Sequence, residues 1–268
     1  MTLTAGIDVG STYTKVVVSD YEDAMVAKVA FPTGYNFARA AERGLDEALA
    51  DAGISRDDVS YIAATGYGRY MVPFRDLAIT ELTCHAFAAH RVFPEVHTVL
   101  DVGGQLVKAI RMDGLGRVKA FRLNDKCAAG SGAFLEKTVR YLGFETSDIP
   151  RLAEASDDPA EVSSVCAVFA ESEVINHLTS GRSAEDVCAG AVVALAGRAG
   201  QIVKRVKPEP AYALTGGLTV VPLMRRMLEE ELGVTFQVRE DLGVYFGALG
   251  AAALARRRLQ MLTERHSA

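Results

Sequence analysis

Short apolar runs separated by glycine-containing turns dominate the beginning of the chain. Residues 3–7 are largely apolar, residues 8–14 form a polar turn that contains a glycine, and residues 16–18 are all valine. β-Branched residues on both sides of a turn are typical of strands, so the pattern predicts a hairpin over residues 3–18. A P-loop or a Rossmann unit would have a helix after its turn, and the sequence therefore favours neither of them.

The next segments alternate between helical and extended patterns. Asn36 is a favourable N-cap for a helix over residues 37–51, and Gly53 follows where that helix would end. The other elements expected in this half are a buried strand over residues 59–64, a glycine loop over residues 65–69 and a helix over residues 79–92 closed by Pro94.

The hairpin pattern returns near the middle of the chain. Residues 99–100 lead into Asp101-Val102-Gly103-Gly104-Gln105-Leu106, and residues 107–111 form the expected return strand. Because Asp-Val-Gly stands in the same context at 8–10 and at 101–103, the sequence indicates a weak internal repeat and two duplicated lobes. Each lobe would offer a glycine hairpin to a shared cleft, which would place two sets of backbone N–H groups around one phosphate chain.

A third glycine turn lies further along the chain. A short strand over residues 212–214 runs into Thr215-Gly216-Gly217, and a helix through Val221 follows. This order of strand, glycines and helix lets a planar ring or a phosphate approach the backbone closely. Residues 243–258 are rich in glycine and alanine, and we expect them to form a helix that packs tightly against such a site.

Two cysteines stand in matched local settings. Cys127 precedes a glycine-rich turn that opens an amphipathic helix, and Cys166 falls near the first turn of a helix that two serines can cap. Helix N-termini lower the pKa of a thiol and suit thiolate ligands of a metal cluster. The alternative is that both are buried free cysteines. Cys84 and Cys188 lie in apolar helical segments, and we expect them in the core. The histidines lack the spacing of metal ligands, and we expect them at the surface or in the core.

Composition narrows the class of protein. The 268 residues suffice for one large domain or for two lobes around a cleft. A net charge of −5 argues against general nucleic-acid binding. The first residues lack the pattern of a signal peptide, and no stretch approaches the ~20 uninterrupted apolar residues of a membrane helix. Four cysteines without a secretory signal argue against a disulfide framework, and we expect a cytoplasmic protein.

Seven segments together resemble the motifs of one family. They are Asp8-Val9-Gly10-Ser11-Thr12 with Lys15, Thr65–Arg69, Glu81–His85, Asp101–Gln105, Asn124–Gly130, Cys166–Glu173 and Thr215-Gly216-Gly217. In this order they resemble BadF/BcrA-type ATPases, which activate 2-hydroxyacyl-CoA dehydratases or form the ATP-binding subunits of benzoyl-CoA reductase. The resemblance implies an α/β fold of the actin-like type, with two duplicated lobes around a nucleotide cleft. The N-terminal lobe would span residues 1–98, with the C-terminal helix returning to it, and residues 99–268 would form the lobe with the cluster cysteines.

The same resemblance implies roles for the matching residues. Asp8 would hold Mg²⁺ through water, Asp101 would help to place the metal or the attacking water, and Lys15 would act with them in catalysis. Cys127 and Cys166 from each of two chains would bind one [4Fe–4S] cluster, so the implied cofactors are ATP or ADP, Mg²⁺ and this cluster. The residues expected to contact the nucleotide are Gly10, Ser11, Thr12, Lys15, Gly103, Gly104, Gln105, Gly216 and Gly217.

The implied function is ATP-driven electron transfer at low potential, with a homologous subunit or a second copy of the chain sharing the cluster. The further partners would be iron–sulfur CoA-ester reductase or dehydratase subunits, with neither nucleic acid nor a membrane involved. The residues around Cys166 favour a benzoyl-CoA reductase subunit. A homodimeric activator of a dehydratase remains the alternative. Leu106 stands where many members of this family carry an acidic residue. The expectation of ATP hydrolysis is therefore weaker than the expectation of nucleotide binding. Two further alternatives are an actin-fold small-molecule kinase and an assembly protein, but neither gives the two cysteines a role. No chemical role is assigned to Tyr67 or Arg69.

Overall fold

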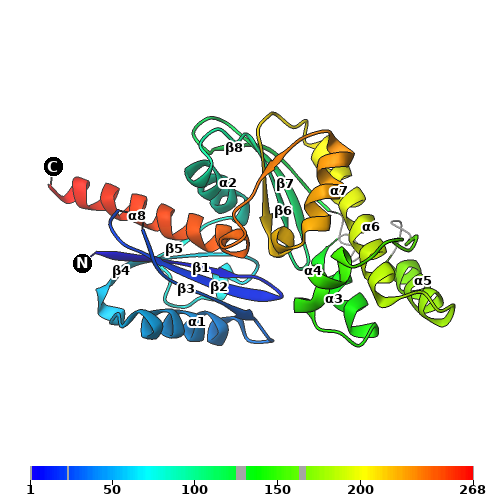
Figure 1. Ribbon diagram of the computed structural model, residues 1–268. Helices are drawn as coiled ribbons and strands as arrows, with labels where there is room; N and C mark the ends of the chain where they lie inside the picture. The colour runs from blue at the N-terminus through cyan, green and yellow to red at the C-terminus, as the bar shows by residue number, and fades with distance from the viewer. Residues whose placement is uncertain (1, 23, 125–130, 163–166, 268) are drawn as a thin grey trace. The chain divides into compact units, whose positions relative to one another are not determined.

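The computed structural model describes residues 2–22, 24–124, 131–162 and 167–267 (Figure 1). The chain divides into two compact units. The first unit consists of Met1–Glu95, Met112–Val118 and Val244–Ala268, and the second unit consists of Val96–Arg111 and Lys119–Gly243.

The first unit is built on a five-stranded mixed sheet in the order β3-β2-β1-β4-β5. β1 pairs with β2 antiparallel and with β4 parallel, so the expected hairpin over residues 3–18 is confirmed. The strands are β1 (Leu3–Val9), β2 (Tyr13–Ser19), β3 (Met25–Pro32), β4 (Val59–Thr65) and β5 (Leu77–Ala78), and the helices are α1 (Phe37–Ala52), α2 (Glu81–Val92) and α8 (Phe246–Ser267).

Helices cover both faces of this sheet (Figure 1). Because side chains alternate along a strand, Val16 and Val18 pack in the core with α1, while Val17 packs with Ala248 and Ala252 of α8. The helix α1 begins and ends as expected, since the Asn36 side chain accepts the N–H of Arg39 and Gly53 adopts a left-handed conformation.

The small residues of α8 allow its backbone to touch the sheet. A Cβ atom on Gly6 of β1 would lie 1.9 Å from the carbonyl oxygen of Ala248 and 2.4 Å from the nitrogen of Ala252. On the side facing α2, a Cβ atom on Gly250 would lie 2.0 Å from the carbonyl oxygen of Cys84. Glycine at these positions therefore fixes how closely the last helix lies against the strand that ends in Asp8.

The second unit repeats the same sheet. Its strands are β6 (Thr98–Val102), β7 (Val107–Met112), β8 (Val118–Leu123), β9 (Tyr212–Gly216) and β10 (Phe236–Gln237), in the order β10-β9-β6-β7-β8. β6 is antiparallel to β7 and parallel to β9, as β1 is to β2 and β4. Its helices are α3 (Gly132–Tyr141), α4 (Ile149–Glu154), α5 (Ala167–Thr179), α6 (Ala184–Arg205) and α7 (Pro222–Leu232).

This shared connectivity confirms the duplicated α/β architecture that the sequence predicts. The core of the second unit gathers around α6, whose Leu195 and Ala199 pack with Leu100 of β6 and Leu135 of α3. Within the described residues, α6 alone has the length and apolarity of a membrane span, but 67% of its most apolar window is buried inside the structure. The core helix of a globular unit meets the same criteria, and that is the place of α6 here.

Candidate functional site: two aspartate–lysine hairpins

The turn between β1 and β2 brings together most of the residues expected at the first phosphate site. The N–H of Gly10 donates to the carbonyl of Tyr13 at 3.0 Å and closes the turn. Asp8 and Lys15 are direct cross-strand neighbours, so their side chains leave the same face of the hairpin. The Lys15 ammonium donates to Oδ2 of Asp8 at 3.1 Å, which compensates a carboxylate that is only 5% exposed.

The turn between β6 and β7 has the same construction. The N–H of Gly103 donates to the carbonyl of Leu106 at 2.9 Å, and Asp101 faces Lys108 across the strands. The Lys108 ammonium donates to Oδ2 of Asp101 at 2.7 Å, and the Thr215 hydroxyl donates to Oδ1 at 3.0 Å. Both members of this ion pair are buried. Sequence reasoning did not single out Lys108, although the spacing from Asp101 to Lys108 equals that from Asp8 to Lys15.

Each hairpin lies against a glycine at the end of a neighbouring parallel strand. Gly66 follows β4 with φ +89, and a Cβ atom there would lie 2.5 Å from both Oδ1 of Asp8 and the carbonyl oxygen of Val9. Gly216 at the end of β9 has φ +96, and its Cβ atom would lie 2.3 Å from the carbonyl oxygen of Val102. The loop over residues 65–69 and the turn at 215–217 are therefore equivalent parts of the repeat. Gly217 follows, exposed, at the start of a short 3₁₀ turn.

A buried histidine lies beside the first aspartate. His85, on α2, is 5% exposed. A Cβ atom on Gly247 would be 2.7 Å from Oδ2 of Asp8 and 3.3 Å from Nε2 of His85, so both side chains border the same small space. The sequence predicts a surface or core position for His85, and the structure places it in the core next to the Asp8 carboxylate.

The arrangement fits a hydrated magnesium ion that arrives with a nucleotide. Among the described residues, no group of three or more His, Cys, Asp or Glu side chains is placed to hold a metal ion. Mg²⁺ keeps several waters and binds through one or two carboxylates together with substrate phosphates, and the carboxylate at each hairpin, Asp8 or Asp101, has the chemistry of such an anchor. Glycine turns also present backbone N–H groups, and Lys15 and Lys108 supply positive charge at the same places.

The two expected cluster ligands, Cys127 and Cys166, lie outside the described residues. The structure describes the chain on both sides of each of them: Asn124 and Ser131 around the first, and Val162 and Ala167 around the second. Cys84 and Cys188 are free and fully buried, as expected, and burial raises the pKa of each thiol to about 12.

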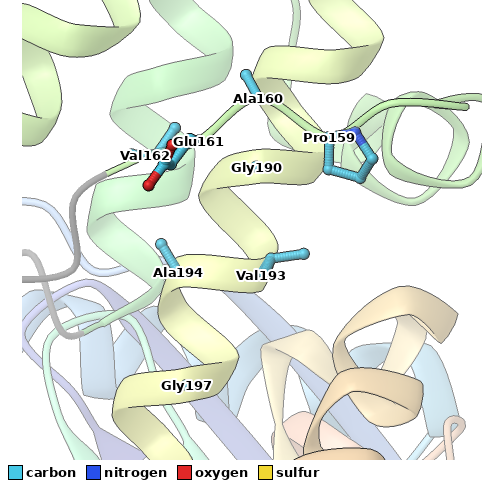
Figure 2. A pocket seen from close by; sticks show the side chains of 8 residues that line it. All are labelled: Pro159, Ala160, Glu161, Val162, Gly190, Val193, Ala194 and Gly197. Carbon is cyan, nitrogen blue, oxygen red and sulfur yellow. The ribbon is translucent and has the colours of Figure 1, made fainter.

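A shallow hollow of about 360 Å³ lies beside the segment that leads towards Cys166 (Figure 2). Residues 159–162 form one wall and the small-residue face of α6 forms the other, with Gly190 and Gly197 at its ends. A Cβ atom on Gly190 would lie 2.0 Å from the carbonyl oxygen of Ala160, so the segment rests directly on α6. Among the described residues that line the hollow, Glu161 is the single titratable one, and they offer no chemistry comparable to that of the hairpins.

The sequence profile of the BadF/BadG/BcrA/BcrD ATPase family matches residues 5–255. The chain belongs to this family. Two similar relatives of this ATPase are the (R)-2-hydroxyglutaryl-CoA dehydratase activating ATPase of Acidaminococcus fermentans (40% identical) and the activator of lactoyl-CoA dehydratase of Anaerotignum propionicum (39%), each over 94% of this chain and 96% of the relative. One of the subunits of the benzoyl-CoA reductase of Thauera aromatica is 34% identical, over 94% of this chain and 92% of its own.

The fold comparison agrees with the sequence comparison. The activator of the 2-hydroxyisocaproyl-CoA dehydratase from Clostridium difficile, solved with bound ADPNP, has a TM-score of 0.92 to this ATPase at 33% identity. The match covers 98% of this chain and 97% of the activator. The expected family and the actin-like ATPase fold are thereby confirmed, and ATP with Mg²⁺ is the ligand that the family implies.

Proposed function

We propose that this ATPase uses ATP to drive electron transfer at low potential through a [4Fe–4S] cluster shared by two chains. One observation carries the proposal. A chain that is 39–40% identical to activators of 2-hydroxyacyl-CoA dehydratases holds a buried aspartate paired with a lysine at each of two duplicated glycine turns. This is the arrangement that a nucleotide-driven device requires, because it offers cations, backbone N–H groups and a carboxylate at the same places.

In this proposal, ATP binding separates each lysine from its aspartate and gives both side chains new partners. In the structure each ammonium lies on its own aspartate, Lys15 on Asp8 and Lys108 on Asp101. Phosphate oxygens would compete for these ammonium groups, and each aspartate carboxylate would then be available to accept hydrogen bonds from water molecules on Mg²⁺. Asp101 also accepts the Thr215 hydroxyl, which keeps its carboxylate oriented while Lys108 moves.

Two thiolates per chain are available for a cluster. Cys84 and Cys188 are enclosed in the core with a raised pKa, which leaves Cys127 and Cys166 as the ligands. A Cys₄ cluster then needs two more thiolates, and a second chain supplies them. When bound, the cluster carries a single electron at a potential set by its hydrogen bonds, charge and solvent exposure.

The acceptor is a CoA-ester enzyme. The relatives favour a 2-hydroxyacyl-CoA dehydratase, since two activators of such enzymes reach 39% and 40% identity while the benzoyl-CoA reductase subunit reaches 34%. We therefore place the homodimeric activator first. The reductase subunit remains the second candidate, because the residues around Cys166 resemble those subunits and Leu106 suits a chain that works beside a similar, different one.

The test is anaerobic purification followed by iron analysis of three proteins: wild type, Cys127→Ala and Cys188→Ala. Wild type should be brown, with broad absorption near ~400 nm and about four irons per dimer. Cys127→Ala should lose the iron and keep ATP binding. Cys188→Ala is the matched control, because it removes a buried thiol that the proposal does not use, and it should keep the iron.

The same preparation separates the rival functions. Iron-free wild-type protein would contradict the proposal, and ATP turnover that requires an added sugar or acid would establish the small-molecule kinase instead. A brown dimer of identical chains supports the activator. A brown complex that forms only with a second, homologous chain supports the reductase subunit.

A further inference from the structure

Asn124 lies between the phosphate hairpin of the second unit and the stretch that carries Cys127. Its backbone N–H donates to the carbonyl of Val107 at 3.0 Å, and its side-chain Oδ1 accepts the N–H of Val107 at 3.0 Å. The side-chain amide also donates to the carbonyl of Gln105 at 3.4 Å. Asn124, which precedes the cysteine stretch, is thus bonded once to Gln105 in the turn expected to hold phosphate and twice to Val107, the residue that directly follows this turn.

The other end of the stretch is attached to the same turn. The N–H of Gly132 donates to the carbonyl of Gly103 at 3.0 Å, and that of Ala133 donates to the carbonyl of Gly104 at 2.6 Å. These are groups that the first turn of α3 leaves without partners in its own helix. A Cβ atom on Gly132 would lie 3.2 Å from the carbonyl oxygen of Gly103, so the helix begins directly against the hairpin.

The first unit has an equivalent attachment that is not followed by a cysteine motif. Thr33 follows β3 as Asn124 follows β8, and its N–H donates to the carbonyl of Thr12 at 2.9 Å. Its hydroxyl donates to the carbonyl of Gly10 at 2.8 Å. A polar residue after the third strand therefore fixes the hairpin turn in both units. In the second unit alone, the chain goes on into a cysteine motif and returns to the same turn at Gly132.

The segment before Cys166 is attached elsewhere. The N–H of Ala160 donates to the carbonyl of Asp186 in α6 at 2.9 Å, and the backbone of Ala160 rests on Gly190 of the same helix (Figure 2). The two cysteine motifs therefore differ in what holds their neighbours: the hairpin turn for Cys127, and α6 on the N-terminal side of Cys166.

We propose that Asn124 is a positioning residue that transmits the conformation of the turn over residues 103–106 to Cys127. Exchange of ATP for ADP changes the contacts of this turn, and the bonds of Asn124 on one side and of Gly132 and Ala133 on the other carry the change to both ends of the cysteine stretch. The inference rests on the proposed binding of nucleotide at this turn, and it adds the residue through which nucleotide and thiol communicate.

The experiment measures thiol accessibility in reduced, cluster-free protein. Alkylation rates of Cys127 and Cys166 are followed peptide by peptide by mass spectrometry, with ADP and with a non-hydrolysable ATP analogue. In wild type the Cys127 rate should differ between the two nucleotides by at least about fivefold, the lower end of ordinary coupling between sites. In Asn124→Ala that ratio should fall towards one, while the ratio at Cys166 stays as in wild type.

Two further variants make the result specific. Asn124→Asp keeps an acceptor for the N–H of Val107 and loses the donor to Gln105, so its Cys127 ratio should lie between those of Asn124→Ala and wild type. If Asn124→Ala does not fold, Asn124→Asp serves alone. Asn36→Ala is the matched control, because it removes the same amide from the N-cap of α1, and its ratio should equal that of wild type.

The outcomes for the inference and for the proposed function are distinct. A wild-type ratio in both Asn124 variants, or no nucleotide effect on Cys127 in wild type, would overturn the role of Asn124. Iron analysis decides the cluster independently. Iron-free wild-type protein with an Asn124-dependent Cys127 ratio would remove the electron-transfer function and keep the coupling.

Discussion

Lys108 donates its ammonium to Asp101 at 2.7 Å across two neighbouring strands, and both side chains are withdrawn from water. The equivalent pair in the first unit, Lys15 and Asp8, is longer at 3.1 Å and less buried, with Lys15 18% exposed against 9% for Lys108. The two hairpins therefore have the same construction, but the ion pair of the second hairpin is more fully excluded from water. Removing one member of a buried pair leaves an uncompensated charge, so the two sites should respond differently to the same substitution.

Lys108→Met should destabilise the protein more than Lys15→Met. For the more buried pair the expected loss is about 3–5 kcal/mol, because Asp101 would remain as a lone buried carboxylate. Urea denaturation of both variants measures the difference. Adding Asp101→Asn to Lys108→Met should recover part of the loss, and a double variant no more stable than Lys108→Met would contradict the assigned ion pair.

Gly66→Ala should weaken nucleotide binding and cost stability beyond the strain of its positive φ. The new methyl group would overlap Oδ1 of Asp8 and the backbone of Val9, which displaces the carboxylate expected to hold Mg²⁺. Gly53→Ala is the matched control, because Gly53 also has a positive φ and nothing lies within 4 Å of its Cβ position. We expect a cost of about 1–2 kcal/mol for the control. Equal effects of the two substitutions on ATP affinity, measured by titration calorimetry, would show that Gly66 does not shape the site.

The buried thiols should make the protein less stable at alkaline pH. Burial raises the pKa of Cys188 from 9.0 to about 12, so the native thiol stays protonated where the unfolded thiol ionises. This stabilising contribution is fully present below the unfolded pKa and is lost as pH rises from there towards the folded pKa. At about pH 10 the loss should be about 1.4 kcal/mol for this thiol. Cys188→Ala should lack that part of the decline, which denaturation at about pH 8 and about pH 10 measures; an unchanged decline would refute the assignment.

Leu106→Asp should accelerate ATP hydrolysis. Leu106 is exposed at the tip of the second hairpin, where its carbonyl accepts the N–H of Gly103, and a carboxylate there would add a ligand for water or Mg²⁺ beside the phosphates. A rise of about tenfold corresponds to about 1.4 kcal/mol in the transition state. Leu115→Asp places the same charge on an exposed leucine of the β7–β8 turn and should leave the rate unchanged. A slower or unchanged rate in Leu106→Asp would place position 106 outside the reaction.

The sequence predicts much of this fold because its strongest signals are local. Valines on both sides of a polar turn predict the first hairpin, and the caps Asn36 and Gly53 delimit α1 closely. The same reasoning did not find β3 or β8. Both are the third strand of a hairpin unit, with half or more of the residues exposed, and neither contains a run of buried β-branched residues. Their place depends on pairing with β2 and β7, which is a tertiary property.

The site was harder to predict where its parts come from separate elements. Asp8 and Lys15 lie in one motif, whereas Thr215 reaches Asp101 and His85 reaches the surroundings of Asp8 only because the sheet and helices bring them there. Lys108 can be predicted from the sequence, because aligning the two Asp-Val-Gly hairpins residue by residue places it opposite Lys15. Asn124 belongs to one of the motif segments, but its proposed role depends on bonds to Val107 and Gln105, and these depend on the pairing of β7 with β8.

Native mass spectrometry of anaerobically purified protein can show whether two chains share one cluster. We expect a dimer whose mass exceeds that of two chains by one [4Fe–4S] cluster, and loss of that extra mass in both Cys127→Ala and Cys166→Ala. A cluster carried by a single chain, or a dimer that keeps its cluster in either variant, would contradict it.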